Sequence, residues 1–405
     1  MKMPRVMRRA LGVGITVAMA AALGGTALTL GATSAGALGP LNFTVVASGL
    51  NSPRHLTVGP DGALYVATAG TGGPGSPGGD CLATTNPAGS ATFNCFGTTS
   101  TIARVTLGGN VTTALSGLPS VIQEPAAPIP APDYSGAAGV TWANGKLQVV
   151  TQVQSLNPDG STNFASPSKT LMARLISATP GTASSQWTVG ANFAAYAAAN
   201  PQSVATAGPP SPDESITDSD PFAITPYNGG FAVADAAANA LRFVSSTGAI
   251  TNLASFPFVN GAQAVPTSVV VGPDGALYVG ELLGAPSPAG GAVVYRVTPG
   301  NAPTVYASGF SAVTDIAFDR AGRLLVLEYN TAGLLGPPTA TGAVIRVNPD
   351  HSKTTLADTG LSQTTGMAVG PDGSIYVSNH GNSAGTGQIV RIPVTSQDGY
   401  AEVAA

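Results

Sequence analysis

Charged side chains are scarce in this chain: Asp, Glu, Lys and Arg together make up 9% of it, against roughly a quarter in an average soluble domain. Hydrophobic residues make up 43%, which excludes a disordered chain, because disorder combines low hydrophobicity with high net charge. The sequence is instead rich in turn-forming residues, with 52 Gly and 33 Pro. Such a composition predicts many turns and few helices.

Histidine is also rare, and the sequence lacks two common enzyme motifs. Only His55, His351 and His380 are present. The sequence contains no His-Glu-x-x-His zinc motif and no phosphate-binding loop. We expect His351 and His380 to lie in turns or loops, so neither marks a catalytic centre.

Cysteine is limited to Cys81 and Cys95. In an exported protein, two cysteines within one loop are expected to form a disulfide, worth roughly 3 kcal/mol in the chain-entropy description of loop closure. The bridge would hold a long surface loop, residues 69–100. Metal binding by the pair is disfavoured, because no histidine and only Asp80 lies beside them.

The first 37 residues carry the pattern of a secretory signal peptide: a basic start, an apolar stretch to Leu30 and a small-x-small cleavage signal at Ala35–Ala37. A membrane anchor is the alternative, which the glycine-rich apolar stretch and the cleavage signal disfavour. Arg8 and Arg9 leave general secretory and twin-arginine export both open. We therefore predict a secreted, extracellular protein, with residues 38–405 as one domain and no stable membrane insertion after cleavage.

The net charge of the chain after removal of the signal segment indicates which classes of partner it can bind. The signal segment holds four basic and no acidic residues, so its removal leaves 12 basic and 20 acidic groups and a net charge of −8. This charge disfavours nucleic acid and anionic membranes as partners. We expect a monomer whose partner is an extracellular protein, glycan or small molecule.

Two elements recur along the chain and predict its fold. Six arginines each occupy a short apolar strand, at Arg104, Arg174, Arg242, Arg296, Arg346 and Arg391. A Gly-Pro-Asp-Gly turn between β-rich runs occurs at 59–62, 272–275 and 370–373, with degenerate copies in the other units. Each unit therefore has strands A and B around this turn, strand C with the arginine, and strand D. Six four-stranded units predict an all-β, six-bladed β-propeller.

The ends of the chain predict how the ring closes. The last unit ends soon after Arg391 and lacks strand D, whereas residues 43–48 resemble a strand D. We expect this N-terminal strand to complete the last blade, which removes an open sheet edge. We also expect the strand C arginines to be structural and to pair with acids or amides at the end of strand B, such as Asp235, Glu281 and Asn379.

The residues that lead into each strand A are expected to meet at one mouth of the central channel. The six pairs are Arg54–His55, Ala137–Ala138, Asp220–Pro221, Thr267–Ser268, Thr314–Asp315 and Thr365–Gly366. Sixfold symmetry breaks here, which favours a ligand site lined by Arg54, His55, Asp220, Thr267, Asp315 and Thr365. Asp220 and Asp315 suggest Ca²⁺, which prefers several oxygen ligands. The alternative is that these groups satisfy strand ends and buried water. Two long insertions, 119–135 and 200–220, are expected to cover this mouth as loops.

The segment Asp235–Phe243 resembles the NHL repeat. The order of Gly49–Arg54, Val265–Ser268, Gly280–Leu282, Val326–Glu328 and Val377–Gly381 resembles the ScyD/ScyE family over nearly the whole mature chain. The resemblance implies an exported six-bladed propeller with NHL-like or TolB-like blades, and it supplies no catalytic residue.

Two functions remain open. The first is a non-catalytic extracellular binding or scaffold protein. The alternative is a propeller enzyme, either a Ca²⁺-dependent lactonase-like hydrolase or a quinone-dependent sugar dehydrogenase, since Gly49–Val66 is similar to the opening of the glucose/sorbosone dehydrogenases. His55 would then be the base. Against this, Ala67–Gly70 replaces the charged cluster of those enzymes, and few basic groups remain to hold a quinone, so we favour binding.

Overall fold

The computed structural model describes residues 43–75, 78–85, 91–124, 132–152, 162–203, 215–216, 218–258, 262–337 and 339–394. The predicted signal segment and the C-terminal residues 395–405 lie outside these ranges. Within them the protein is almost entirely β-structure, with one short α-helix, α1 (Phe193–Ala199), and two short 3-10 helices, Pro167–Leu171 and Ser184–Gln186. None of the helices described there is long and apolar enough to cross a membrane.

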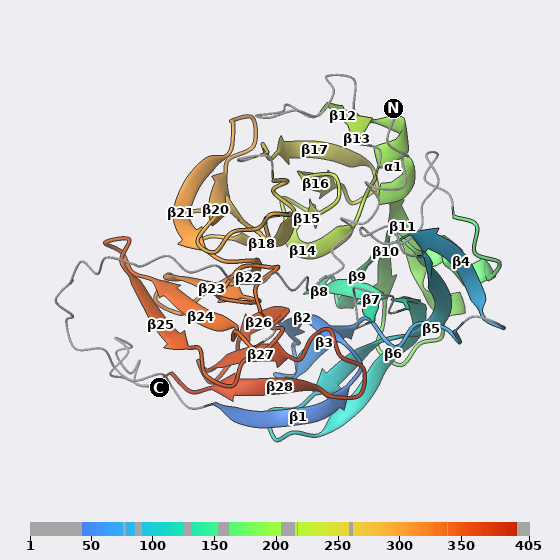
Figure 1. The fold of residues 1–405 in the computed structure, drawn as a ribbon, viewed down its shortest axis with the longest axis horizontal. Coiled ribbons are helices and arrows are strands. Elements are labelled where there is room, and N and C mark those ends of the chain that lie inside the picture. The colour runs from blue at the N-terminus through green and yellow to red at the C-terminus, as the bar shows by residue number, and fades with distance from the viewer. Residues whose placement is uncertain are drawn as a thin grey trace.

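All but two of the described strands form six antiparallel sheets arranged as blades around a centre (Figure 1). Blade 1 contains β2 (Pro53–Val58), β3 (Leu64–Thr68), β5 (Ala91–Val105) and β6 (Val111–Gln123); blade 2 contains β8 (Ala137–Ala143), β9 (Lys146–Thr151), β10 (Arg174–Ala178) and β11 (Thr188–Asn192); blade 3 contains β14 (Pro221–Tyr227), β15 (Gly230–Asp235), β16 (Ala240–Val244) and β17 (Ile250–Ser255). Blade 4 contains β18 (Pro266–Val271), β19 (Leu277–Glu281), β20 (Ala292–Val297) and β21 (Thr304–Phe310); blade 5 contains β22 (Val313–Phe318), β23 (Leu324–Glu328), β24 (Ala343–Val347) and β25 (Lys353–Ala357); blade 6 contains β26 (Gly366–Val369), β27 (Ile375–Asn379), β28 (Gly387–Ile392) and β1 (Thr44–Leu50). The predicted six-bladed propeller is confirmed.

The first strand of every blade faces the centre, and these strands form a closed ring. Contacts run from β2 to β8, β14, β18, β22 and β26 in turn, and from β26 back to β2. Ring closure also uses the chain ends as predicted: β1 pairs with β28, and Thr44 lies opposite Arg391. The N-terminal strand thus serves as the outer strand of the last blade, which satisfies a backbone edge that β28 would otherwise expose.

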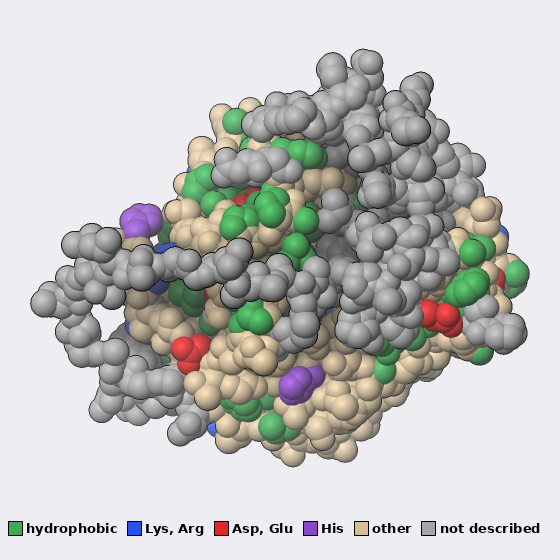
Figure 2. Space-filling view, in the orientation of Figure 1, with side chains coloured by type: hydrophobic (Ala, Val, Ile, Leu, Met, Phe, Trp, Pro, Cys, Tyr) green, Lys and Arg blue, Asp and Glu red, His purple; other side chains and the backbone are tan. Residues whose placement is uncertain are grey.

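The hydrophobic core lies between the blades rather than inside any one of them. Each pair of neighbours shares a buried cluster, for example Ile102 with Leu147, Val150 with Phe231, Leu241 with Leu277, Val294 with Val326, Leu327 with Val377, and Ile389 with Val66. Strands buried on both faces have little room for charge, which explains the low charged fraction of the chain. Figure 2 shows correspondingly few acidic or basic side chains on the face in view.

The repeated Gly-Pro-Asp-Gly segment forms the turn between strands A and B, as predicted. Gly62 has φ +73°, a left-handed conformation that glycine adopts at little cost. Its N–H donates to the Gly59 carbonyl at 3.0 Å, and the N–H of Ala63 donates to the Asp61 carboxylate at 3.3 Å. The Asp61 side chain therefore stabilises the turn in which it lies.

The prediction for the strand C arginines was wrong in three blades. Arg104, Arg296 and Arg391 pair with the turn aspartates Asp61, Asp274 and Asp372 at 2.7, 2.7 and 2.9 Å. The cause is strand register: each of these arginines lies opposite the tyrosine near the start of strand B, away from the residue at its end. Arg242, in contrast, contacts the acid at the end of its strand B, Asp235, at 3.6 Å. The first three pairs are partly exposed, so each contributes little to stability.

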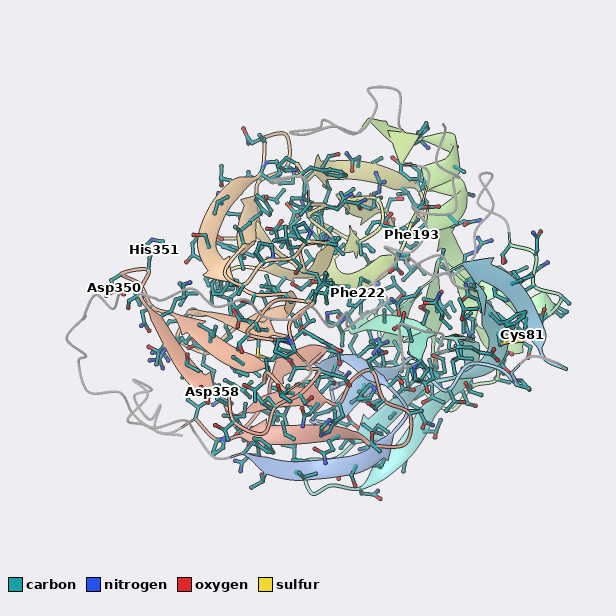
Figure 3. All side chains as sticks on the ribbon, in the orientation of Figure 1. Cys81, Phe193, Phe222, Asp350, His351 and Asp358 are labelled. Carbon is teal, nitrogen blue, oxygen red and sulfur yellow. A yellow bond between two sulfur atoms is a disulfide. The ribbon has the colours of Figure 1, made fainter. Side chains whose placement is uncertain are left out.

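The disulfide between Cys81 and Cys95 is present, with an S–S distance of 2.09 Å. The segment that it joins is not the predicted loop. β4 (Asp80–Thr85) pairs with an extension of β5 beyond blade 1, and the two cysteines are direct cross-strand partners. Cys95 is fully buried, whereas Cys81 lies toward the outer rim of the molecule (Figure 3).

The predicted loop 119–135 is also partly a strand pair. β6 continues past blade 1 and pairs with β7 (Asp133–Ser135). The other predicted loop, 200–220, is described only in part. The structure gives a short strand pair, β12 (Gln202–Ser203) with β13 (Ser215–Ile216), and residues 218–220, which lead into β14. Strand extension lets these insertions satisfy their backbone groups, as buried chain must.

Candidate functional site

The starts of the six inner strands converge at one end of the channel, and three of the predicted positions there hold neighbouring blades together. The hydroxyl of Thr267 donates to the Val313 carbonyl at 2.7 Å. Thr314 donates in the same way to Thr364 at 2.9 Å, and Thr365 donates to Pro53 at 2.7 Å. Each of these hydrogen bonds joins one blade to the next. Thr267 and Thr365 therefore have a structural role at this end of the ring.

Arg54 occupies the equivalent threonine position in blade 1, where sixfold symmetry breaks. Its side chain is buried, and its guanidinium donates to the carbonyls of Gly381 and Tyr134 and to the Asn382 side chain. Burial lowers the pKa of Arg54, opposed by the charges of Asp133 and Asp220. Because arginine stays charged in proteins, the mouth contains a fixed buried cation that bridges β2, β7 and the loop after β27.

Asp133 is the acid that most strongly affects Arg54, and the predicted site residues did not include it. It is buried, and neither carboxylate oxygen makes a hydrogen bond to the described part of the chain, although the Tyr134 N–H and the Asn382 amide lie nearby. Burial raises the pKa of Asp133 to about 6, against the opposing charge of Arg54. The sequence offered only its place in the proline-rich insertion, because its approach to Arg54 depends on the β6–β7 pair.

His55 and Asp315 form the second charged contact. His55 Nε2 lies 3.6 Å from Asp315 Oδ1, and Nδ1 lies 3.3 Å from the Ala138 carbonyl oxygen. The Phe222 ring packs edge-on against the imidazole, at 5.4 Å between centroids. Asp315 in turn accepts the backbone N–H groups of Ile316 and Met367, and burial raises its pKa to about 6.

Asp220 connects the mouth to blades 2 and 3. Its Oδ2 accepts the Gln152 side-chain amide at 3.4 Å, and its own N–H donates to Asp235 at 2.8 Å. Asp235 is held in turn by the Ser219 hydroxyl. The structure therefore brings Arg54, His55, Asp220 and Asp315 to one end of the ring, in two contact groups.

An apolar cluster adjoins these polar groups. Tyr329 and Phe222 belong to a buried set that also includes Ala138, Val265 and Leu334, and Figure 3 places Phe222 near the middle of the ring. The Tyr329 hydroxyl is buried and makes no hydrogen bond within the described residues, although Gln363 approaches it. Burial and the Asp133 charge raise the pKa of Tyr329, against the effect of Arg54, so the hydroxyl is neutral and can donate.

The oxygen ligands around Asp220 and Asp315 do not favour a calcium site. Within the ranges that the structure describes, no three His, Cys, Asp or Glu side chains group as metal ligands. Both oxygens of Asp315 already accept backbone N–H groups, whereas Ca²⁺ needs six to eight oxygen ligands. Calcium binding by Asp220 and Asp315 stays an untested prediction.

Comparison with known proteins supplies neither a family nor a chemistry for this chain. No family model matches the chain, and no curated protein sequence is similar to it. Solved structures match over most of its length. The apo-form soluble aldose sugar dehydrogenase of Escherichia coli is 12% identical, with 87% of this chain and 99% of that chain covered and a TM-score of 0.49.

Two further structures match at similar levels. The catalytically inactive virginiamycin B lyase of Staphylococcus aureus with quinupristin is 13% identical, covering 88% and 99% of the two chains, with a TM-score of 0.45. A putative gluconolactonase is 9% identical, covering 87% and 93%, with a TM-score of 0.47. At such identities and scores the likeness carries no functional argument, and the six sheets themselves establish the propeller.

Proposed function

We propose that this protein is an exported, non-catalytic binding propeller of the ScyD/ScyE type. It would act outside the cytoplasm and hold a protein, glycan or small molecule at the channel mouth around Arg54 and Asp133. The family assignment rests on the sequence resemblance alone. Export is supported by the N-terminal signal pattern and by the Cys81–Cys95 bridge, because disulfides persist in oxidising compartments.

The observation that carries this proposal is that the His55 ring is buried among protein groups. A general base needs a ring nitrogen within hydrogen-bond reach of the substrate proton. In this structure Nδ1 lies 3.3 Å from the Ala138 carbonyl oxygen. The buried Nε2 lies 3.6 Å from Asp315 and makes no hydrogen bond within the described residues, so protein groups enclose both nitrogens. The polar groups at the mouth are thus arranged to hold a fixed charge pattern, which suits recognition better than proton transfer.

Native mass spectrometry of protein purified from culture medium tests the proposal. We expect a noncovalently bound partner on the wild type, lost in Asp133→Asn. The matched control is Asp61→Asn, the same change in a turn at the opposite end of strand A, which should keep the partner. Lactone hydrolysis and quinone-linked sugar oxidation should stay at the rate of buffer alone. Turnover that Asp133→Asn abolishes would overturn the proposal in favour of the enzyme.

A further inference from the structure

Several polar atoms at the channel mouth are buried and make no hydrogen bond of good geometry to the described residues, although Asn382 lies close to Asp133 and Gln363 close to Tyr329. They are both carboxylate oxygens of Asp133, Gln152 Oε1 and the Tyr329 hydroxyl. The three residues are 7%, 4% and 4% exposed. Native proteins keep few such atoms, because each one costs about 1–3 kcal/mol when it loses water without gaining a partner.

These atoms belong to one neighbourhood. The charges of Asp133, Asp220 and Tyr329 all act on Arg54, and Gln152 is bonded to Asp220. They also come from different elements: β7, the residue after β9, and the residue after β23. Only the closed ring brings them together, so their shared lack of hydrogen bonds of good geometry points to a common ligand.

The chemistry of the set selects the ligand class. An anion would meet Asp133, Asp220 and Asp315, while the one cation beside them, Arg54, already donates to three protein acceptors. A metal ion would need a larger ligand group than the described residues supply. The open atoms include acceptors, at Asp133 and Gln152, and a donor, at Tyr329. A ligand must therefore both donate and accept hydrogen bonds, as neighbouring hydroxyl groups do.

We propose that the channel mouth binds a neutral saccharide through Asp133, Gln152 and Tyr329. Sugar hydroxyls would donate to the Asp133 carboxylate and to Gln152 Oε1, and a sugar oxygen would accept the Tyr329 hydroxyl. The aromatic rings of Tyr329 and Phe222, in the adjoining apolar cluster, would cover a C–H face of the sugar. This inference rests on the proposed binding function and names its ligand class.

Isothermal titration of the mature protein tests it, with D-glucose, cellobiose, maltose and trehalose as neutral probes at millimolar concentration. D-Glucuronate and D-glucosamine are the charged counterparts of glucose. We expect at least one neutral saccharide to bind, and glucuronate to bind about tenfold or more weakly than glucose. Tyr329→Phe should weaken saccharide binding by about tenfold or more, because it removes one hydrogen bond to a sugar oxygen.

Tyr329→Phe is suited to this test because the lost hydroxyl makes no hydrogen bond of good geometry within the described residues, although the Gln363 side chain lies close to it. Its melting temperature should equal or exceed that of the wild type. Tyr278→Phe is the matched control: its hydroxyl donates to Asp274 at the far end of the blade, so saccharide affinity should stay within about twofold. Absence of binding by every neutral probe, preference for glucuronate, or wild-type affinity in Tyr329→Phe would each overturn the inference.

The two proposals fail in different ways. Conversion of a bound saccharide, followed by proton NMR, would refute the non-catalytic function and leave saccharide recognition standing. A copurifying partner that Asp133→Asn releases but Tyr329→Phe retains would leave the binding function standing and reject the saccharide.

Discussion

Buried acids are the distinctive residues of this molecule, and they occupy two kinds of position. Asp133, Asp220 and Asp315 break the symmetry of the channel mouth. Glu281 and Glu328 instead recur at the end of strand B, where each accepts one backbone N–H, from Val293 and Ser311 respectively. Burial raises the pKa of Glu281 to about 8 and that of Glu328 to about 7. A repeated acid is structural, whereas an unrepeated one is a candidate for function.

The raised pKa of Glu281 predicts a pH-dependent stability. A carboxyl whose pKa is higher in the folded than in the unfolded state favours folding most below its unfolded pKa of about 4.5, and this contribution is lost as pH rises toward 8. We expect Glu281→Gln to raise the free energy of unfolding by about 1–3 kcal/mol at pH 8 and to change it little at pH 4. Urea unfolding at both values measures the difference.

Asp274→Asn is the control for that measurement. The partner Arg296 holds the pKa of Asp274 below its usual range, so its loss should destabilise slightly at neutral pH, opposite in sign to Glu281→Gln. A Glu281→Gln variant less stable than the wild type at pH 8 would contradict the assignment.

A second prediction at this scale concerns calcium. Because the Asp315 oxygens are occupied by backbone N–H groups, we expect millimolar CaCl₂ and excess chelator to leave the melting temperature equal within about 1 °C. A native-state ligand in excess would raise it. A clear rise with CaCl₂ that Asp220→Ala removes would restore the calcium prediction.

At the level of elements, insertions in this protein are built as strand extensions. The extended part of β5 is joined to β4 by the disulfide. Loss of the bridge in Cys81→Ser with Cys95→Ser is expected to cost about 2–4 kcal/mol and to act locally. Hydrogen exchange should rise within 80–85 and 91–96 and stay unchanged in blades 3 to 5. Equal protection of 80–85 in variant and wild type would contradict this account.

The closing strand β1 provides a second test of an element. Ala47 faces inward, whereas Val45 is 51% exposed on the same strand. Ala47→Asp would bury an unpaired charge and should lower the free energy of unfolding by about 3 kcal/mol or more. Val45→Asp should change it by about 0.5 kcal/mol. Similar effects of the two substitutions would mean that packing of β1 against blade 6 does not stabilise the closed ring.

At the level of the whole molecule, stability comes from six interfaces of similar kind arranged in a ring. Each cluster joins one blade to the next, and the threonine bonds at the mouth repeat the same linkage. A ring of this kind places its asymmetric residues on the axis, where side chains from several blades meet. For this reason a fold made of repeats can still carry one distinct site.

The sequence alone determined the number of blades, the repeated turn between the first and second strands, the strand that closes the ring and the cysteine pair. These features repeat or are local, so their patterns survive in one dimension. The tertiary structure decided which aspartates pair with the arginines, because the spacing of residues along the sequence does not fix strand register. It also decided that Asp133, Gln152 and Tyr329 share the mouth with Arg54, since they come from elements with no common sequence pattern and are brought together only when the ring closes.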